Sequence, residues 1–395
     1  MKPLEGILVI DFSQFLAGPS ASLRLADLGA RVIKIEKPET GDLCRDLYIS
    51  NLKLDGDSTL FHSINRNKES FAADLKNPAH RAAVLALVDK ADVVIHNFRP
   101  GVIEKLGFDY STLSARRPSL VYGEVSGYGR TGPWAKKPGQ DLLVQSLSGL
   151  PWLNGDADQP PVPFGLAVAD LCAGAHLCQG ILACLVRRGV TGQGGRVEVS
   201  LLESVLDLQF EVLTTFLNDG GKLPERSNVN NAHAYLGAPY GIYATSDGYL
   251  ALAMGSLAQL AELLDSPALL AYTAPGAAFD RRDEIKALLA EHLRRQTTQH
   301  WLARLEPAGY WCADVFTWPQ LMQHPAFEAL DMLLTVTRGE NITMRTTRCP
   351  IRIDEQLFQC GRGAPRLGEH TDALRAEFGL PDQPPRPAPS RREPR

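Results

Sequence analysis

The residue of this chain best placed to do chemistry is Asp170, which stands where a short apolar run enters a segment rich in small residues. The positive end of a helix dipole stabilises a nearby carboxylate, so we expect the side chain of Asp170 to be ionised. An ionised carboxylate can attack an activated acyl group and form a covalent intermediate. The same position suits an ordinary helix N-cap, and the residue pattern alone leaves both interpretations open.

Two other side chains are candidates for proton transfer or nucleophilic attack. His176 lies within the same predicted helix, either as a general base or as a histidine satisfied in the core. Ser126 only partly matches the nucleophile elbow of hydrolases. That motif, G-x-S-x-G, needs glycine at positions 124 and 128, where this chain has Glu124 and Tyr128.

Basic side chains provide candidate contacts for an anionic ligand. The loop 96–101 comes directly after an apolar run, and open parallel sheets bind ligands at the carboxyl ends of their strands. Several cations fall in similar loops, where they either converge on phosphates or remain solvated surface charges. These residues are Lys34, Lys37, Arg45, Lys76, Arg99, Lys105, Lys136 and Lys137.

Two glycine-containing segments resemble nucleotide-binding loops without meeting their requirements. Glu36 stands where dinucleotide-binding folds carry a ribose-binding acid, but only Gly18 lies between Asp11 and Leu23, so the G-x-G-x-x-G turn is missing. The segment 192–195 follows a helix and precedes a strand, the reverse of the order that directs a helix N-terminus at phosphate. Neither segment predicts a nucleotide cofactor.

The elements that must position these residues alternate between strand and helix. Strands are predicted at 7–11, 32–35, 92–96, 120–125 and 196–200, with helices from Gly18 to Gly29, after Asn77-Pro78, and over 170–188. Alternation at this spacing predicts βαβ units and a parallel sheet, hence an α/β fold.

A second unit is predicted after a polar stretch. The expected organisation is a large domain over 1–205, a linker over 206–235, a smaller α/β domain over 236–328 and a return to the large domain over 329–380. In the smaller domain, 242–251 has the pattern of a hairpin and 282–296 that of an amphipathic helix. The last residues, 381–395, are rich in proline and arginine and are expected to be disordered.

Composition limits the class of function. The chain has 395 residues, 44% of them hydrophobic, and a formal net charge of −4, which does not favour nucleic-acid or polybasic membrane binding. Its seven cysteines are scattered without metal-ligand spacing, as is usual in the cytoplasm, and no metal site is predicted. No signal peptide or uninterrupted apolar run long enough to span a membrane is recognised, so we expect a cytoplasmic enzyme.

Taken together, these motifs resemble the class III CoA-transferases, the CaiB/BaiF and formyl-CoA transferase type. The resemblance runs in order from about residue 4 to 379. Its segments are Ile10-Asp11-Phe12, Ala17-Gly18-Pro19, Leu25–Ala30, Val32–Glu36, Gly41-Asp42 with Arg45, Asp74–Asn77, Asn97–Gly101 with Leu106-Gly107, Ser126–Gly129, Thr131–Pro133, Thr191–Gly194, Ala238–Tyr240 with Asp247-Gly248, and Leu367–Thr371.

The resemblance implies a role for most of the candidate residues. Asp170 matches the catalytic aspartate of the family, and Pro138–Asp141 lie near the implied CoA site. The positions that match the family's CoA contacts are Lys37, Leu75, Lys76, Asn97, Phe98, Arg99, Lys105 and Gln140. It further implies a Rossmann-like large domain built from both chain ends, a smaller inserted domain, and an interlocked homodimer.

The implied reaction moves CoA from an acyl-CoA thioester to a small carboxylic acid, dicarboxylates among them, with no tightly bound cofactor. Asp170 would form mixed-anhydride and aspartyl-CoA thioester intermediates in turn. An α-methylacyl-CoA racemase shares the fold, but its Gly-His-Asp motif is Gly139-Gln140-Asp141 here, and an amide cannot exchange the proton. A catalytically silent CoA-binding protein is the third alternative.

Two departures bear on the substrate. The chain has no glycine run near 253–256 like the one that shields the intermediate in formyl-CoA transferases. It also carries Gly309-Tyr310-Trp311-Cys312 where relatives have a proline-containing turn. These residues leave the donor and acceptor acids open.

Overall fold

The computed structural model describes residues 1–47 and 52–380 and divides them into two compact units. Unit 1 comprises residues 1–141, 168–204 and 332 onward, and unit 2 comprises 142–167 and 205–331. The stretch 142–167, expected in the large domain, therefore belongs to unit 2. The stretch predicted as a linker contains a helix, α9 (Phe210–Asn218), that belongs to unit 2. The predicted disordered tail lies outside the described residues.

Unit 1 is built on a six-stranded parallel sheet, which confirms the predicted α/β fold. Its strand order is β5-β2-β1-β6-β7-β8. The strands are β1 (Leu8–Asp11), β2 (Arg31–Glu36), β5 (Glu69–Ala72), β6 (Val93–His96), β7 (Val121–Ser126) and β8 (Gly195–Ser200). Its helices are α1 (Ala17–Asp27), α2 (Thr59–Asn65), α3 (Pro78–Val88), α4 (Val102–Leu106), α5 (Tyr110–Arg116), α7 (Val168–Thr191), α16 (Thr371–Phe378) and the 3₁₀ helix η1 (Leu43–Asp46).

Helices cover both faces of this sheet. The side chains of Ile10, Ile33 and Tyr122 form a buried core with α3, α4 and α5. The neighbouring residue of β7, Gly123, faces the other way, since a Cβ there would lie 3.0 Å from side-chain carbons of Leu177 and Ile181 on α7. Alternate residues of each strand thus meet different helical layers.

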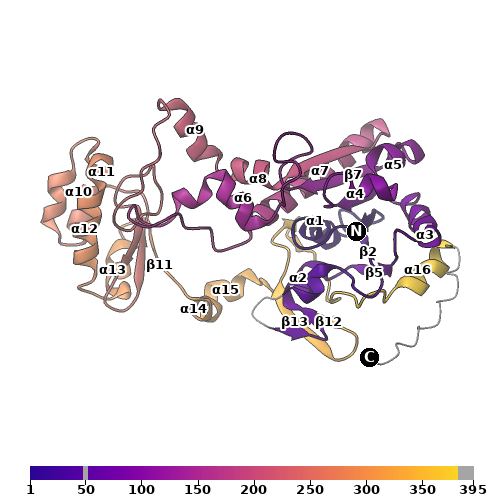
Figure 1. Cartoon of the computed structure of the whole chain (residues 1–395). Coiled ribbons are helices and arrows are strands. Elements are labelled where there is room, and N and C mark those ends of the chain that lie inside the picture. The colour runs from indigo at the N-terminus through magenta and orange to yellow at the C-terminus, as the bar shows by residue number, and fades with distance from the viewer. Residues whose placement is uncertain (48–51, 381–395) are drawn as a thin grey trace, which may run out of the picture. The chain divides into compact units, whose positions relative to one another are not determined.

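The chain returns to unit 1 at its carboxyl end. Short antiparallel pairs precede the last helix: β12 (Leu333–Arg338) with β13 (Ile342–Thr347), and β14 (Arg352–Ile353) with β15 (Gln356–Leu357); β3 (Lys53–Leu54) pairs with β4 (Asp57–Ser58) near the other end. Helix α16 packs against β5 (Figure 1), and its Leu374 is buried in the same core. Residues from both chain ends therefore build unit 1.

Unit 2 has its own core and sheet. The three strands β9 (Gly241–Ala244), β10 (Tyr249–Leu252) and β11 (Cys312–Asp314) are antiparallel, and β9 and β10 form the predicted hairpin. Its helices are η2 (Leu150–Leu153), α9, α10 (Leu257–Leu263), η3 (Pro267–Tyr272), α11 (Ala277–Asp280), α12 (Arg282–Leu293), α13 (Thr298–Leu305), α14 (Trp318–Gln323) and α15 (Pro325–Leu330). Helices α6 (Asp141–Ser148) and α8 (Leu201–Leu208) contain the points where the chain passes between units.

Helix α7 is the longest element of unit 1 and carries Asp170. Within the described residues it is the one helix long and apolar enough to cross a membrane. It nevertheless packs against α1, β7 and β8 of its own unit, as the core helix of a globular domain does. Its small residues allow this: a Cβ on Gly174 would collide with Ser20 of α1, and one on Gly180 with Val197 of β8.

Candidate active site

The predicted CoA contacts gather at the carboxyl edge of the sheet in unit 1. Lys37 follows β2, Leu75 and Lys76 follow β5, and Asn97 to Arg99 follow β6. Parallel strands end at the same edge, so these loops are neighbours. The strand order reverses between β1 and β6, which makes the gap between their loops the expected ligand crevice of an open α/β sheet.

The loops on either side of this reversal point are held together by one side chain. The amide of Asn97 accepts a hydrogen bond from the backbone N–H of Gln14 (2.9 Å) and donates one to the carbonyl of Gln14 (2.6 Å). Asn97 therefore fixes the loop after β1 against the loop after β6. Its predicted role as a direct CoA contact stays a prediction, and the structure adds this positioning role.

The other predicted contacts differ in exposure. Phe98 and Leu75 are half-buried and pack against the hydrophobic core, so each leaves part of its side chain for a ligand. Lys37, Lys76 and Arg99 are exposed cations at the sheet edge, and the exposed Lys105 lies on α4. Gln140 is exposed and directly precedes α6, and its neighbour Gly139 packs so closely on Gly127, just after β7, that a Cβ on Gly139 would lie 2.5 Å from the Cα of Gly127.

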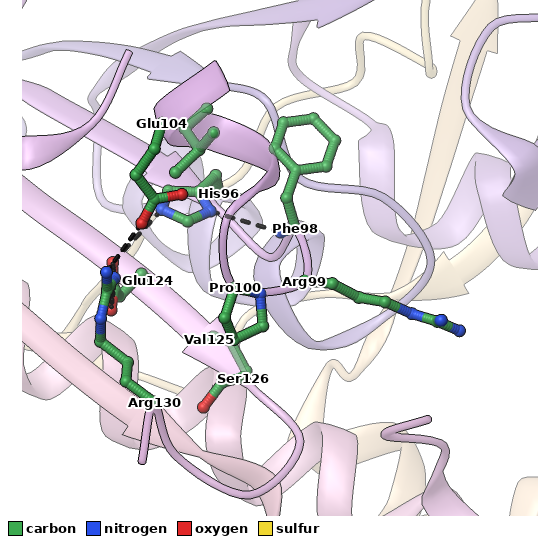
Figure 2. A pocket seen from close by; sticks show the side chains of 10 residues that line it. His96, Phe98, Arg99, Pro100, Glu104, Glu124, Val125, Ser126 and Arg130 are labelled. Carbon is green, nitrogen blue, oxygen red and sulfur yellow. Dashed lines mark hydrogen bonds and ion pairs between the residues drawn. The ribbon is translucent and has the colours of Figure 1, made fainter. Parts of the chain in front are cut away.

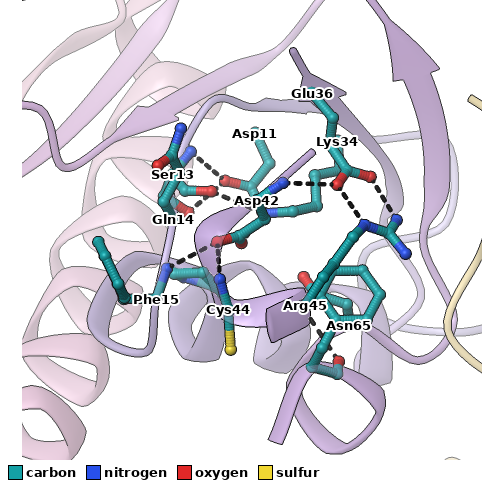
Figure 3. A network of polar contacts seen from close by, with 12 residues as sticks. Asp11, Ser13, Gln14, Phe15, Lys34, Glu36, Asp42, Cys44, Arg45 and Asn65 are labelled. Atoms are coloured by element: carbon teal, nitrogen blue, oxygen red, sulfur yellow. Dashed lines mark hydrogen bonds and ion pairs between the residues drawn. The ribbon is translucent and has the colours of Figure 1, made fainter. Parts of the chain in front are cut away.

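Two basic residues proposed for phosphate contact are structural instead. Lys34 is fully buried, and its Nζ lies 2.8 Å from Oδ2 of Asp42. Burial lowers the pKa of Lys34, but the charge of Asp42 outweighs burial and raises this pKa to about 12. Arg45 is buried, with hydrogen bonds of 2.7 and 2.8 Å to the carboxylate of Glu36 (Figure 3). Their charges are already neutralised, so neither is available for phosphate. Glu36, the apparent ribose-binding acid, is used in the same way.

This buried network holds the loop after β1 in an unusual conformation. Phe15 has a φ of 62°, a left-handed value that costs energy for a residue with a Cβ. Its N–H donates to Oδ1 of Asp42 (3.2 Å), and Nζ of Lys34 donates to the carbonyl of Ser13 (2.6 Å). The phenyl ring is 44% exposed, so the network presents an aromatic surface beside the Gln14–Asn97 contact. Sequence reasoning missed Phe15, because a backbone angle has no signature in its residue type.

A second polar cluster supports the loop after β6. His96 is the last residue of β6 and Glu124 lies in β7; both are buried, with 3.4 Å between Nε2 and Oε2. Arg130 also binds Glu124 (Figure 2), as does Arg196 of β8. The cavity that His96, Glu124 and Arg130 help to line has a volume of about 10 Å³, room for no more than a water molecule. In Figure 2 the side chain of Arg99 extends away from this cluster, which leaves its guanidinium for a ligand at the surface.

Asp170 lies in the first turn of α7, as predicted, and is only partly exposed. One turn further on, Gly174 lets α7 approach α1 so closely that a Cβ there would lie 2.7 Å from the carbonyl oxygen of Ala17. The first turn of α7 is therefore brought beside the start of α1, which follows the loop of Phe15. Its place at a helix start was readable from the sequence pattern, which left an N-cap and a nucleophile open, and the family resemblance assigned it the catalytic role.

The predicted ionisation of Asp170 is wrong in direction. Burial, and then the charge of Asp141, raise the pKa of Asp170 to about 7. The helix N-terminus does not counter this, because Oδ1 of Asp141 already accepts hydrogen bonds from the backbone N–H of Ala169 (2.8 Å) and of Asp170 itself (3.4 Å). The Asp170 carboxyl thus exchanges its proton near neutral pH.

The other two candidate catalytic residues have local partners. Nδ1 of His176 lies 3.0 Å from Oγ of Ser204, and Oγ of Ser126 accepts a hydrogen bond from the N–H of Gly129 (3.0 Å). These are the contacts of a histidine satisfied within the fold and of a turn serine. Among the described residues, no group of three or more His, Cys, Asp or Glu side chains is arranged to hold a metal ion.

Comparisons with known proteins agree with this geometry. Residues 4–371 match the family model described as CoA-transferase family III. The chain is 35% identical over 391 residues to an acetyl-CoA:oxalate CoA-transferase of Acetobacter aceti, covering 96% of this chain and 97% of that one. It is 32% identical to a succinate–glutarate CoA-transferase of Agrobacterium fabrum, covering 95% and 96% of the two chains.

A solved structure shows the same fold. The crystal structure of a CaiB/BaiF family protein from Brucella suis superposes with a TM-score of 0.83 at 32% identity and covers 95% of this chain and 99% of that one. The chain belongs to CoA-transferase family III, and it is therefore an enzyme that uses CoA thioesters. The predicted family, fold and class of activity are confirmed.

Proposed function

We propose that this enzyme transfers CoA from an acyl-CoA thioester to a small dicarboxylic acid, with Asp170 as the nucleophile. The observation that carries the proposal is the partly buried Asp170 carboxyl at the start of α7, in the same unit as the cationic loops at the sheet edge. The relatives named above act on oxalate or glutarate, which favours a dicarboxylate acceptor. Two successive acyl exchanges on one carboxylate account for the reaction.

In the first exchange, a carboxylate oxygen of Asp170 attacks the thioester carbonyl, the C–S bond breaks, and CoA leaves as a thiolate. The product is a mixed anhydride. The thiolate then attacks the Asp170 carbonyl, the C–O bond breaks, and the donor acid leaves as a carboxylate. Asp170 now carries CoA as a thioester.

The second exchange runs these steps in the opposite sense. A carboxylate of the acceptor attacks the Asp170 thioester and releases the CoA thiolate, and the thiolate then attacks the acceptor carbonyl of the new anhydride. Asp170 is restored as a carboxylate, and no net proton is taken up or released. The scheme needs no tightly bound cofactor, and the reaction fits a reducing cytoplasm.

The cationic loops would bind the CoA portion of the substrate. Arg99, Lys76 and Lys37 are exposed at the carboxyl edge of the sheet and suit phosphate groups, while the half-buried Phe98 offers an aromatic face to the adenine. Lys105 on α4 adds a further cation, and the exposed amide of Gln140 offers hydrogen bonds close to Asp141.

We also propose that the enzyme works as the interlocked homodimer implied by the family. Helix α9 has no buried residue, and two of its large apolar side chains, Phe210 and Leu217, are each 68% exposed. Phe210 and Leu217 are seven positions apart and so share one face of the helix, and adjoining exposed apolar side chains mark protein–protein contacts more often than single ones do. A second copy of the chain is the partner that the family resemblance provides, and light scattering would give twice the chain mass of 43.1 kDa.

The test is to incubate the protein with a panel of acyl-CoA donors and dicarboxylic acids and to identify new acyl-CoA products by mass. Asp170→Ala should abolish every product, while Asp109→Ala, which removes an aspartate at the start of α5, should not. Hydroxylamine should trap the aspartyl thioester as a hydroxamate on the peptide that contains Asp170. If the protein exchanges the α-proton of an acyl-CoA but transfers no CoA, racemase activity replaces this proposal. If neither exchange nor transfer is detected, the protein only binds CoA.

A further inference from the structure

A second carboxylate lies beside the nucleophile and has no part in the reaction scheme above. Asp141 is the first residue of α6 and is 8% exposed. Its Oδ1 accepts hydrogen bonds from the N–H groups of Ala169 (2.8 Å) and Asp170 (3.4 Å), both in the first turn of α7. A residue 29 positions earlier in the chain therefore does what an N-cap side chain normally does locally.

This arrangement has an electrostatic consequence. The first N–H groups of a helix stabilise whichever anion they contact, and here that anion is Asp141. Asp170 thus lies at a helix N-terminus whose donors are taken by another carboxylate. Its own ionised form gains little from the helix and is repelled by its neighbour.

The charged groups on the elements packed against α7 do not offset this repulsion. Arg24 and Asp27 of α1 pair with each other at 2.9 Å. Glu124 of β7 binds Arg196 of β8, which also pairs with Glu198. On α7 itself, His176 is directed to Ser204. The pKa of Asp170, raised to about 7, agrees with a site in which burial and Asp141 act without a neighbouring cation.

We propose that Asp141 is a positioning residue for the transfer reaction: it fixes the first turn of α7 and places a negative charge beside Asp170 that favours the acylated form of Asp170 over the free carboxylate. The Asp170 side chain is uncharged in the anhydride and in the thioester. The charge of Asp141 therefore repels the free Asp170 carboxylate but neither intermediate. This inference rests on the proposed function, because it assigns Asp141 a role in the same covalent cycle.

The variant that separates charge from geometry is Asp141→Asn. Asparagine keeps an oxygen that accepts from the α7 amides, and it is as good an N-cap as aspartate, so the turn should persist. Asp141→Ser, another N-cap type, provides a second neutral variant if the first fails to fold. The matched control is Asp109→Asn, which makes the same change at the start of α5, where Asp109 accepts from the N–H of Thr112 at 3.0 Å.

Two measurements test the proposal. The first is a titration of the Asp170 carboxyl by infrared difference spectroscopy without substrate, taken as each protein minus its own Asp170→Asn variant. We expect Asp141→Asn to lower the midpoint by about one pH unit, as removal of a close like charge does, and Asp109→Asn to leave it in place. The second is the fraction of enzyme trapped by hydroxylamine as the Asp170 adduct, which should fall roughly tenfold in Asp141→Asn, with the KM for acyl-CoA changed less than about twofold.

The outcomes distinguish this inference from the proposed function. An unchanged midpoint in both neutral variants, or an equal change in Asp109→Asn, overturns the role of Asp141 even if transfer proceeds normally. A lowered midpoint with an unchanged trapped fraction leaves the electrostatic contact but overturns its effect on the covalent cycle. If the unmodified enzyme transfers no CoA, the proposed function fails and the catalytic role of Asp141 fails with it, whereas the titration still decides whether its charge acts on Asp170.

Discussion

The raised pKa of Asp170 predicts that its carboxylate destabilises the folded protein at neutral and alkaline pH. The folded-state pKa is about 7, against an ordinary value of 3.8. Below the lower value the carboxyl is protonated in both the folded and unfolded states and changes nothing. As the pH rises toward 7 the unfolded chain ionises first, so stability is lost progressively, and above 7 the loss is complete.

The size of this loss follows from the two pKa values. A difference of about three pH units at about 1.4 kcal/mol per unit sets an upper limit of about 4 kcal/mol. Because the Asp170 side chain is partly exposed, solvent screening reduces the expected loss to roughly 2 kcal/mol. Asp170→Asn places a neutral side chain of the same shape at the site and removes the penalty.

The assay is urea denaturation of the unmodified protein and Asp170→Asn at equal protein concentration, at about pH 4 and about pH 8. The stability advantage of the variant should grow by roughly 2 kcal/mol between these two conditions. Asp109→Asn should show little change between these two conditions: although burial raises the pKa of Asp109, hydrogen bonds from Ser111 and Thr112 hold it at about 2, so most of the stabilisation by its charge is already present at about pH 4. A pH-independent difference between Asp170→Asn and the unmodified protein would refute the reasoning.

Three further predictions concern the elements that position the site. Gly174→Val should lower the free energy of unfolding by about 2 kcal/mol, because α7 cannot approach α1 past a side chain, and an unchanged urea midpoint would contradict that packing. Lys68→Met removes the cation that pairs with the buried carboxylate of Asp11 at 3.2 Å and should cost about 3 kcal/mol, whereas a neutral or stabilising effect would show that the pair contributes no stability. Asn97→Ala breaks both hydrogen bonds to Gln14 and should raise the KM for acyl-CoA roughly fivefold, and a KM that does not move would mean that the loop keeps its position without them.

The parallel sheet was predictable because every one of its strands except β5 carries at least two valine or isoleucine residues. Strand β5 was missed, since Glu69-Ser70-Phe71-Ala72 mixes polar and apolar residues. Its polar side chains have distant partners: Glu69 binds Arg31 and Ser70 donates to Glu36. An edge strand can carry such residues when its neighbours satisfy them, and no local pattern reveals that.

The basic residues show the same limit. Lys34 and Lys37 are separated by three positions and look alike in the sequence, yet Lys34 is fully buried against Asp42 and Lys37 is exposed at the sheet edge. The difference arises because Lys34 lies inside β2, where side chains on both faces are buried, whereas Lys37 lies just after the strand ends. The positions of candidate cations can be read from a sequence, but whether each cation is free depends on contacts that form only in the folded chain.

For Asp170, the position at a helix start was predictable from the sequence, but the pKa of its carboxyl was not. The local rule that a helix start stabilises a carboxylate holds in this structure, but it acts on Asp141, which takes the α7 amides from another part of the chain. A nucleophile that was strongly stabilised as an anion would be slow to form a neutral anhydride, and one that stayed protonated would not attack. A pKa near neutral pH avoids both extremes, so the displacement of Asp170 from the helix dipole suits the role of nucleophile that we propose for it.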